Sequence, residues 1–207
     1  YNLGVCYEKG DGVEKDLAKA IKWYKLSAEQ AYTKAKYALA VCYTEGIGVP
    51  KDDVMASKLL KSAAELGHAD SQYSLGNRYY NGNYNNGIHG AETDINSAIH
   101  WYTQAAGQGH VDAQCTLGDY YRDNRIYGSA VKWYKLAAEQ GNVAAQNELG
   151  LCYYDGKGVG QDYAEAVKWF RLAAEQGNAN AQNNLGNRYY LGQGVPQDYA
   201  EAVKWYR

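Results

Sequence analysis

The chain has 207 residues, a formal net charge of −2 and 46% hydrophobic residues, which is an ordinary composition for a globular protein. The near-neutral charge excludes the strong basic field that nucleic-acid-binding proteins carry. No stretch approaches the roughly 18 consecutive apolar residues that a membrane-spanning helix needs. Neither nucleic-acid binding nor membrane insertion is therefore expected.

A leucine recurs at regular intervals and marks six repeated units along the chain. It occurs at Leu3, Leu39, Leu75, Leu117, Leu149 and Leu185. Three of the steps are 36 residues long, and the other two are 42 and 32 residues long. A period of this size predicts an array of identical supersecondary units, each of which packs only against its neighbours.

The units differ in length when they are followed in chain order. The first begins inside its first helix, and the second follows at the standard spacing. The third has six extra residues between Leu75 and Trp101, and their polar stretch 83–90 is expected to protrude as a longer loop, either as neutral drift or as a partner-specific element. The fourth lacks four residues between Leu117 and Trp133, and the GxGV turn of the other units is lost with them.

The fifth unit shows most clearly what one repeat contains. Residues 143–155 place apolar or small side chains at helical spacing, which predicts a first helix that ends at Gly156. Asp162 and Glu165 predict a capping box that begins a second helix, and this helix ends at Gly177. The sixth unit repeats the capping signature. Each unit is therefore predicted to form two antiparallel helices.

Glycines and tryptophans occupy matching positions in most units. A glycine follows the repeat leucine except in the second unit, where Ala40 stands, and it is expected to let the partner helix approach closely. The tryptophans are expected to be buried wedges, and Leu59 replaces them in the second unit, which should be the weaker one. These tryptophans are Trp23, Trp101, Trp133, Trp169 and Trp205.

The pattern AQNNLGNRYYLGQGVPQDYAEAVKWY over residues 181–206 resembles the Sel1-like repeat, a relative of the tetratricopeptide repeat. The 36-residue steps and the GxGV loop distinguish it from tetratricopeptide units of about 34 residues. The resemblance covers essentially the whole chain. It implies an all-α fold, a right-handed α/α superhelix of about six two-helix repeats of which the first and last are incomplete. It also implies a single solenoid domain over residues 1–207 that acts as a non-catalytic adaptor or scaffold between proteins.

By the same resemblance, the first helices line a concave groove that binds a peptide or a helical segment of a partner protein. The exposed positions of these helices vary from unit to unit, whereas the buried positions repeat. Tyrosines offer rigid contact area, and asparagines can pair with an extended backbone. The predicted groove residues are Tyr37, Tyr73, Asn77, Tyr80, Asp119, Arg122, Asn147, Tyr154, Asn183, Asn187 and Tyr190.

Cysteines and histidines offer little chemistry. The cysteines fall on first helices, which lie about 8–10 Å apart, beyond the Cα limit of about 7 Å for a disulfide, so free thiols are expected. His68 and His110 each follow a glycine and are predicted to be exposed turn residues. No metal-ligand spacing, phosphate-binding loop or catalytic grouping occurs, so no metal, cofactor or catalytic residue is expected.

Two other functions stay open at this point. A cysteine-rich branch of the same repeat family suggests a hydrolase or a β-lactam-binding protein, although the paired cysteines of that branch are missing here. A structural spacer beside a catalytic domain is the other. Both ends interrupt a repeat, so the chain is expected to be a fragment of a longer protein, whose exposed end repeats could associate end to end.

Overall fold

The computed structural model describes residues 1–82 and 93–207, and the predicted loop at 83–90 lies outside these ranges. Within them the chain forms twelve α-helices and no strand. The helices are α1 (Asn2–Lys9), α2 (Leu17–Glu29), α3 (Thr33–Glu45), α4 (Asp53–Glu65), α5 (Ala69–Tyr80), α6 (Ile95–Gly107), α7 (Val111–Asp123), α8 (Tyr127–Glu139), α9 (Val143–Asp155), α10 (Tyr163–Glu175), α11 (Ala179–Leu191) and α12 (Tyr199–Trp205). The all-α prediction is confirmed, and the predicted first helix at 143–155 matches α9 at both ends.

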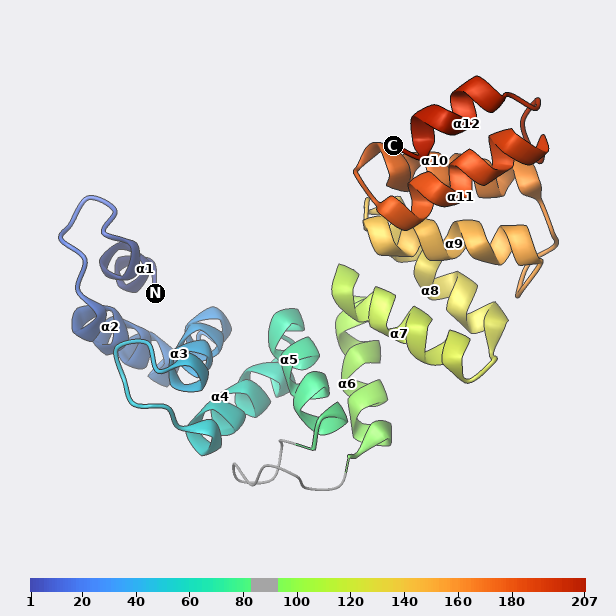
Figure 1. The fold of residues 1–207 in the computed structure, drawn as a ribbon. Helices are drawn as coiled ribbons and strands as arrows, with labels where there is room; N and C mark the ends of the chain where they lie inside the picture. Colours follow the sequence, from blue (N-terminus) through green and yellow to red (C-terminus); the bar gives the residue numbers. More distant parts are fainter. Residues whose placement is uncertain (83–92) are drawn as a thin grey trace. The chain divides into compact units, whose positions relative to one another are not determined.

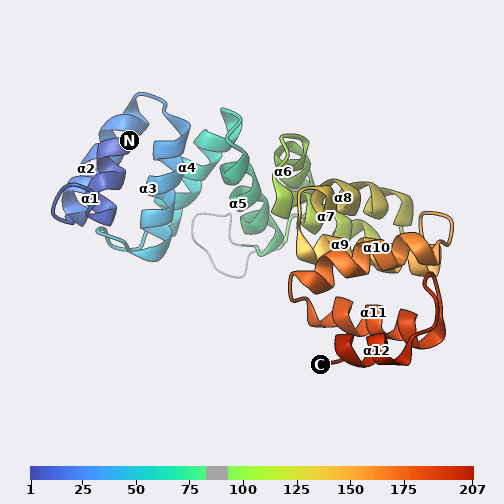
Figure 2. The same cartoon turned by 90° about the horizontal axis from the view of Figure 1, so that it is seen from above.

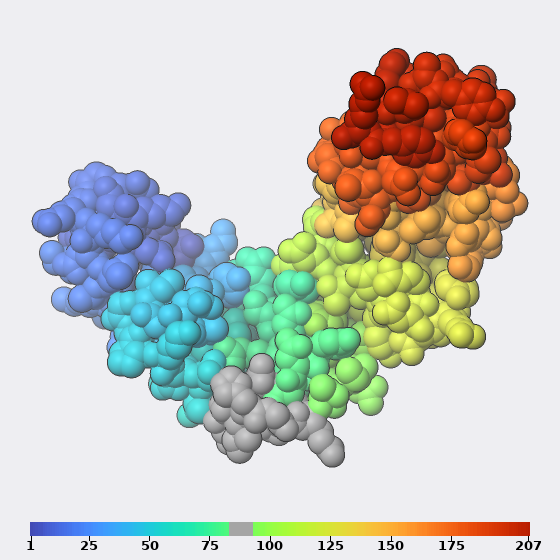
Figure 3. Space-filling view, viewed as in Figure 1, coloured from blue at the N-terminus to red at the C-terminus, as the bar shows by residue number. Residues whose placement is uncertain are grey.

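The helices group into two compact units of three repeats each, Tyr1–His110 with α1–α6 and Val111–Arg207 with α7–α12 (Figures 1 and 2). Within each unit every helix packs against the next one in the chain. In the space-filling view, consecutive repeats of the second unit abut in chain order, from yellow to red (Figure 3). The interpretation of residues 1–207 as one continuous domain stays a prediction.

The ends of the helices follow the signals read from the sequence. The Asp162 side chain accepts from the backbone N–H groups of Ala164 and Glu165, and so caps the start of α10. Asp198 caps α12 in the same way. Gly156 ends α9 in the left-handed conformation, at φ 70°, where a glycine carries no steric penalty. None of the helices in the described ranges combines the length and the apolar character that a membrane span requires.

In four of the six repeats the buried wedge is the aromatic residue that follows the predicted tryptophan, whereas the second repeat buries Leu60 and the sixth leaves Tyr206 44% exposed. Trp23 is 36% exposed, whereas Tyr24, its neighbour in sequence, is 1% exposed. Trp169 is half-buried and packs against the core cluster that contains Tyr134, a residue of the preceding repeat. The prediction of tryptophan wedges is therefore wrong. One step along a helix rotates a side chain by about 100°, and this rotation places the following residue in the core.

In five repeats a glycine follows the repeat leucine and lies against the ring of this second-helix aromatic residue. A Cβ atom added to Gly118 would lie 2.5 Å from the ring of Tyr134, so only a glycine leaves room for the aromatic. The pairs come from the two helices of the same repeat and change together. They are Gly4 with Tyr24, Ala40 with Leu60, Gly76 with Tyr102, Gly118 with Tyr134, Gly150 with Phe170 and Gly186 with Tyr206. The second repeat thus has alanine in place of the glycine and leucine in place of the aromatic residue.

Glutamines join neighbouring repeats at the start of the odd-numbered helices. Gln146 is 4% exposed, donates to the Ala138 carbonyl of α8 and accepts from Gln176 just after α10. Gln72 makes the same two contacts with Ala64 and Gln108 in the first unit. Each of these side chains therefore bridges three consecutive helices.

Candidate functional site

The predicted groove residues all lie on odd-numbered helices, but they differ in exposure. Tyr80 and Tyr190 are exposed, at 48% and 52%, and Asn183 is exposed as well. Asn147 is only 5% exposed, so its prediction as a surface contact is wrong. Its amide oxygen accepts from Asn184 of the next repeat, which explains its burial. The half-buried members are Tyr37, Tyr73, Asn77, Asp119, Arg122, Tyr154 and Asn187.

Three of these polar residues accept hydrogen bonds from tyrosines of the second helix of their own repeat, of which Tyr102 and Tyr134 are buried and Tyr206 is exposed. Asn77 Oδ1 accepts from the Tyr102 hydroxyl, and Asn187 Oδ1 accepts from Tyr206, both at 2.7 Å. Asp119 accepts from Tyr134 at 2.7 Å in the same way. The two asparagines keep their Nδ2 donors, so each combines an internal contact with an N–H group that a partner can use.

Two histidines, His68 just before α5 and His110 just after α6, pack against tyrosine rings. The side chain of His68 is 12% exposed and that of His110 is 14% exposed, so the prediction of exposed turn residues is wrong. The His68 ring lies 5.2 Å from the Tyr37 ring, and the His110 ring lies 4.6 Å from the Tyr73 ring, measured between centroids. Both imidazoles face the Asp70 carboxylate, at 3.9 and 3.5 Å. Burial lowers the pKa of His68, so the neutral ring is the favoured form.

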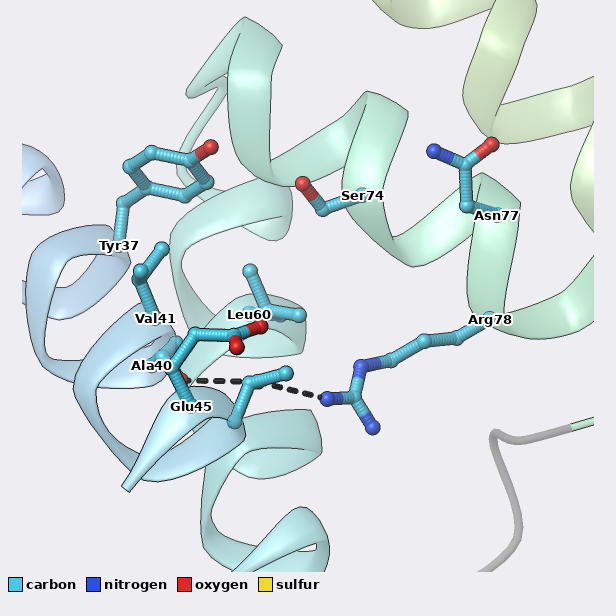
Figure 4. Close-up of a pocket in the computed structure, with 9 residues that line it drawn as sticks. Tyr37, Ala40, Val41, Glu45, Leu60, Ser74, Asn77 and Arg78 are labelled. Atoms are coloured by element: carbon cyan, nitrogen blue, oxygen red, sulfur yellow. Dashed lines mark hydrogen bonds between the residues drawn. The ribbon is translucent and has the colours of Figure 1, made fainter. Parts of the chain in front are cut away.

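A pocket of about 210 Å³ opens between α3 and α5 in the first unit (Figure 4). Its apolar surface comes from the Tyr37 ring, Val41 and Leu60. Its polar surface comes from Thr44, Glu45, Ser74, Asn77 and Arg78. Arg78 reaches from α5 toward α3, where Nη2 donates to Thr44 at 2.9 Å (Figure 4). The pocket therefore has an apolar side and a rim of both charges.

An equivalent pocket of about 220 Å³ lies between α7 and α9 in the second unit. The guanidinium of Arg122 contacts Asp119, Asp123 and Glu148, at 2.8–3.1 Å. Lys157, on the same pocket wall, pairs with Asp155 at 2.8 Å. The predicted residues Asp119 and Arg122 thus belong to one network of charges, and they are engaged with each other in the free protein.

Arg188 was missed by the sequence analysis, which considered the tyrosines and asparagines of its helix. It belongs to α11, and its side chain reaches α9, where the guanidinium lies 4.0 Å from the centre of the Tyr154 ring. The residue is 6% exposed. The available signal was the charge itself, because Arg188 is the sole charged residue of α11.

The thiols lack the properties of nucleophiles. All four cysteines are free, and burial raises the pKa of Cys42, Cys115 and Cys152 to about 11, so these thiols are protonated at neutral pH. The described residues contain no group of three or more His, Cys, Asp or Glu side chains placed to hold a metal ion.

Stacked helix pairs with variable residues on one face define the class of protein, an α-solenoid built from two-helix repeats. The Sel1 repeat family model matches six times and covers the whole chain, at residues 1–32, 33–68, 69–110, 111–142, 143–178 and 179–207. The chain therefore belongs to the Sel1 repeat family. Proteins of this family commonly serve as protein–protein interaction scaffolds and are generally non-catalytic.

Solved structures with the same fold support the assignment. A Sel1 repeat protein from Oxalobacter formigenes is 33% identical, with a TM-score of 0.82, over 99% of this chain and 83% of that one. A protective antigen of uropathogenic Escherichia coli with this fold is 32% identical, with a TM-score of 0.58, and this chain covers 51% of its length. The immunity protein Pa5087 from Pseudomonas aeruginosa is 21% identical over 100% of this chain and 80% of its own, with a TM-score of 0.51, and shares the fold. No curated protein matches the sequence significantly. These matches do not support the hydrolase and spacer interpretations.

Proposed function

We propose that the odd-helix face of each unit binds an extended peptide segment of a partner protein. By odd-helix face we mean the surface formed by α1, α3 and α5 in the first unit and by α7, α9 and α11 in the second. The family supports a role in protein binding. The variable, partly exposed tyrosines and asparagines of this face support its use as the contact surface.

The pocket between α3 and α5 carries the proposal. Its volume of about 210 Å³ is below the range of about 300–1,000 Å³ that is usual for small-molecule sites. It therefore suits a single amino-acid side chain better than a free ligand. Tyr37, Val41 and Leu60 favour an apolar side chain, which would act as the anchor of the bound segment.

Asparagines on the same face complement the backbone of a bound segment. The Oδ1 atoms of Asn77 and Asn187 already accept from tyrosines, so the groups that these side chains offer to a partner are their Nδ2 donors. Asn183 is exposed on α11. An extended peptide offers carbonyl oxygens at regular intervals, and side-chain amides of this kind pair with them. A helical segment satisfies its own backbone and would leave these donors without partners.

A displayed library of random peptides, panned against the whole chain, tests the proposal. Peptides with a shared apolar anchor residue are expected to be enriched. Replacement of Tyr37, which lines the pocket, together with Tyr80, Tyr154 and Tyr190 by alanine is expected to abolish their binding while helical content is retained. A control variant carries Leu136→Ala and Leu172→Ala, two exposed leucines of even-numbered helices, and should still bind. Full binding by the tyrosine variant, or loss in the leucine control, would place the contact surface elsewhere.

A further inference from the structure

Two arginines occupy the same position in different parts of the repeat array. Leu39 and Leu75 are 36 residues apart, as are Leu149 and Leu185, so the second repeat and the first helix of the third align with the fifth repeat and the first helix of the sixth without gaps. In this alignment Arg78 on α5 corresponds to Arg188 on α11. Each arginine reaches toward the preceding odd-numbered helix, and the two surroundings can be compared residue by residue.

Both terminal nitrogens of the Arg78 guanidinium, Nη1 and Nη2, have acceptors inside the protein. Its Nη1 donates to the Ser57 hydroxyl at 3.0 Å, and Nη2 donates to Thr44 at 2.9 Å. The Asp53 carboxylate lies 3.3 Å from Nη2 and supplies the opposite charge. A side chain that is 12% exposed thus has both its hydrogen bonds and its counter-ion.

Arg188 has a single acceptor and no counter-ion among the described residues. Its Nη1 donates to the Gln193 amide oxygen at 2.6 Å, and its guanidinium stacks on Tyr154. The Nε atom is buried and has no hydrogen-bond partner. Removal of a charge from water is unfavourable without an opposite charge, and a neutral amide and an aromatic face compensate only in part.

The difference arises from substitutions at the surrounding positions. Thr44, Asp53 and Ser57, which satisfy Arg78, correspond in the alignment to Tyr154, Tyr163 and Val167. Glu45 corresponds to Asp155, which is one methylene shorter and pairs with Lys157 at 2.8 Å. Helix α11 contains no acidic residue. The chain has therefore kept the arginine and replaced its internal acceptors.

We infer that Arg188 binds a carboxylate side chain, aspartate or glutamate, of the peptide held on the odd-helix face of the second unit. The inference rests on the proposed function and adds the chemistry of one contact. The carboxylate replaces the Gln193 oxygen as the acceptor from Nη1 and supplies the charge that Asp53 supplies to Arg78. Tyr154 holds the guanidinium plane. Arg188 is thus a specificity-determining residue for an acidic position in the partner.

Blocked tripeptides test the contact without knowledge of the natural partner. The probes are acetyl-Ala-Glu-Ala-amide and acetyl-Ala-Gln-Ala-amide, which differ in charge and match in shape. In NMR spectra of the whole chain, the Arg188 Nε–Hε signal is expected to shift with the glutamate peptide, and at least fivefold less with the glutamine peptide. Equal shifts with both peptides, or no shift with either, would overturn the inference.

Matched variants separate a binding role from a structural one. Arg188→Gln is expected to remove the acidic preference of peptides enriched from the library, whereas Arg171→Gln, on α10 of the same unit and outside the odd-helix face, is expected to leave it intact. Tyr163→Asp keeps Arg188 and supplies an internal carboxylate at the position of Asp53, so it should also remove the preference, and it covers the case in which Arg188→Gln fails to fold. If the enriched peptides show no acidic preference, or if the preference persists in Tyr163→Asp, the inference about Arg188 is contradicted while the proposed function stands. Failure to enrich any peptide counts against the proposed function, and the tripeptide spectra still decide the role of Arg188.

Discussion

The hydroxyl of Tyr102 donates a 2.7 Å hydrogen bond to Asn77 Oδ1, and this contact links the core of a repeat to its odd-helix face. Equivalent bonds join Tyr134 to Asp119 and Tyr206 to Asn187. Where the core residue lacks a hydroxyl, the acceptor position is apolar. These apolar pairs are Phe170 with Leu151 and Leu60 with Val41. In the first repeat this position is Val5 and the Tyr24 hydroxyl donates to Glu8 instead, so the surface residue matches the core residue in five of the six repeats.

This pairing predicts strong coupling between Asn77 and Tyr102. Asn77→Leu removes the acceptor of the Tyr102 hydroxyl, a residue that is 2% exposed, and it should lower the free energy of unfolding by about 1–3 kcal/mol. The double variant Asn77→Leu/Tyr102→Phe reproduces the Leu151–Phe170 pair and should recover most of that loss. Urea unfolding of the wild type, both single variants and the double variant measures the coupling. Additive losses would show that the bond contributes little.

The small residue beneath each aromatic predicts a second coupled pair. Gly118→Ala places a methyl group 2.5 Å from the Tyr134 ring and should destabilise the fold by about 1–3 kcal/mol. Gly118→Ala/Tyr134→Leu reproduces the Ala40–Leu60 pair and should be less destabilised than the sum of its single variants. Thermal and urea unfolding supply the comparison. Gly128→Ala is the control, since a Cβ atom there meets no neighbour within 4 Å.

His68 predicts a loss of stability in weak acid. Burial lowers its pKa below the ordinary value of 6.5, with Lys34 acting in the same direction and Asp70 against it. The unfolded chain then binds the proton more tightly, so the contribution of His68 is intact above pH 6.5 and is lost as the pH falls through its lower folded pKa. His68→Asn keeps a side-chain cap of the type that Asn142 supplies to α9. The variant should gain stability relative to the wild type between pH 7.5 and 5, and a constant difference would contradict this account.

Arg125 predicts a stabilising substitution in the shortened turn of the fourth repeat. Its φ of 61° is in the left-handed region, which costs an ordinary residue about 1–2 kcal/mol. Arg125→Gly should therefore raise the melting temperature, with a gain of up to about 1 kcal/mol. Arg125→Ala removes the same charge without relieving the backbone, and should give no gain. A gain of equal size in both variants would point to charge instead of backbone conformation.

The repeat period and the capping residues were sufficient to predict the helices. Each signal is local, as in the match between 143–155 and α9, because caps and glycines act within one turn. The identity of the buried aromatic was beyond this reasoning. Tryptophan and tyrosine are adjacent, both are apolar enough for a core, and a rotation of about 100° decides between them.

The candidate site was harder to predict, because its properties depend on contacts between repeats. Asn147 occupies a groove position, but Asn184 of the next repeat buries and bonds it. Arg188 becomes unusual only when Tyr154, Tyr163 and Val167 are recognised at the positions whose counterparts supply the acceptors of Arg78. Such combinations involve residues 20–40 positions apart, which a helical pattern does not relate to one another.

The contact between each glycine and its aromatic ring has a genetic consequence. Both partners lie within one repeat, so duplication or deletion of a whole repeat carries a matched pair, and the array can grow or shrink without a core mismatch. A point mutation at either position meets an unmatched partner and is selected against. Change should therefore spread through such arrays mainly by exchange of entire repeats.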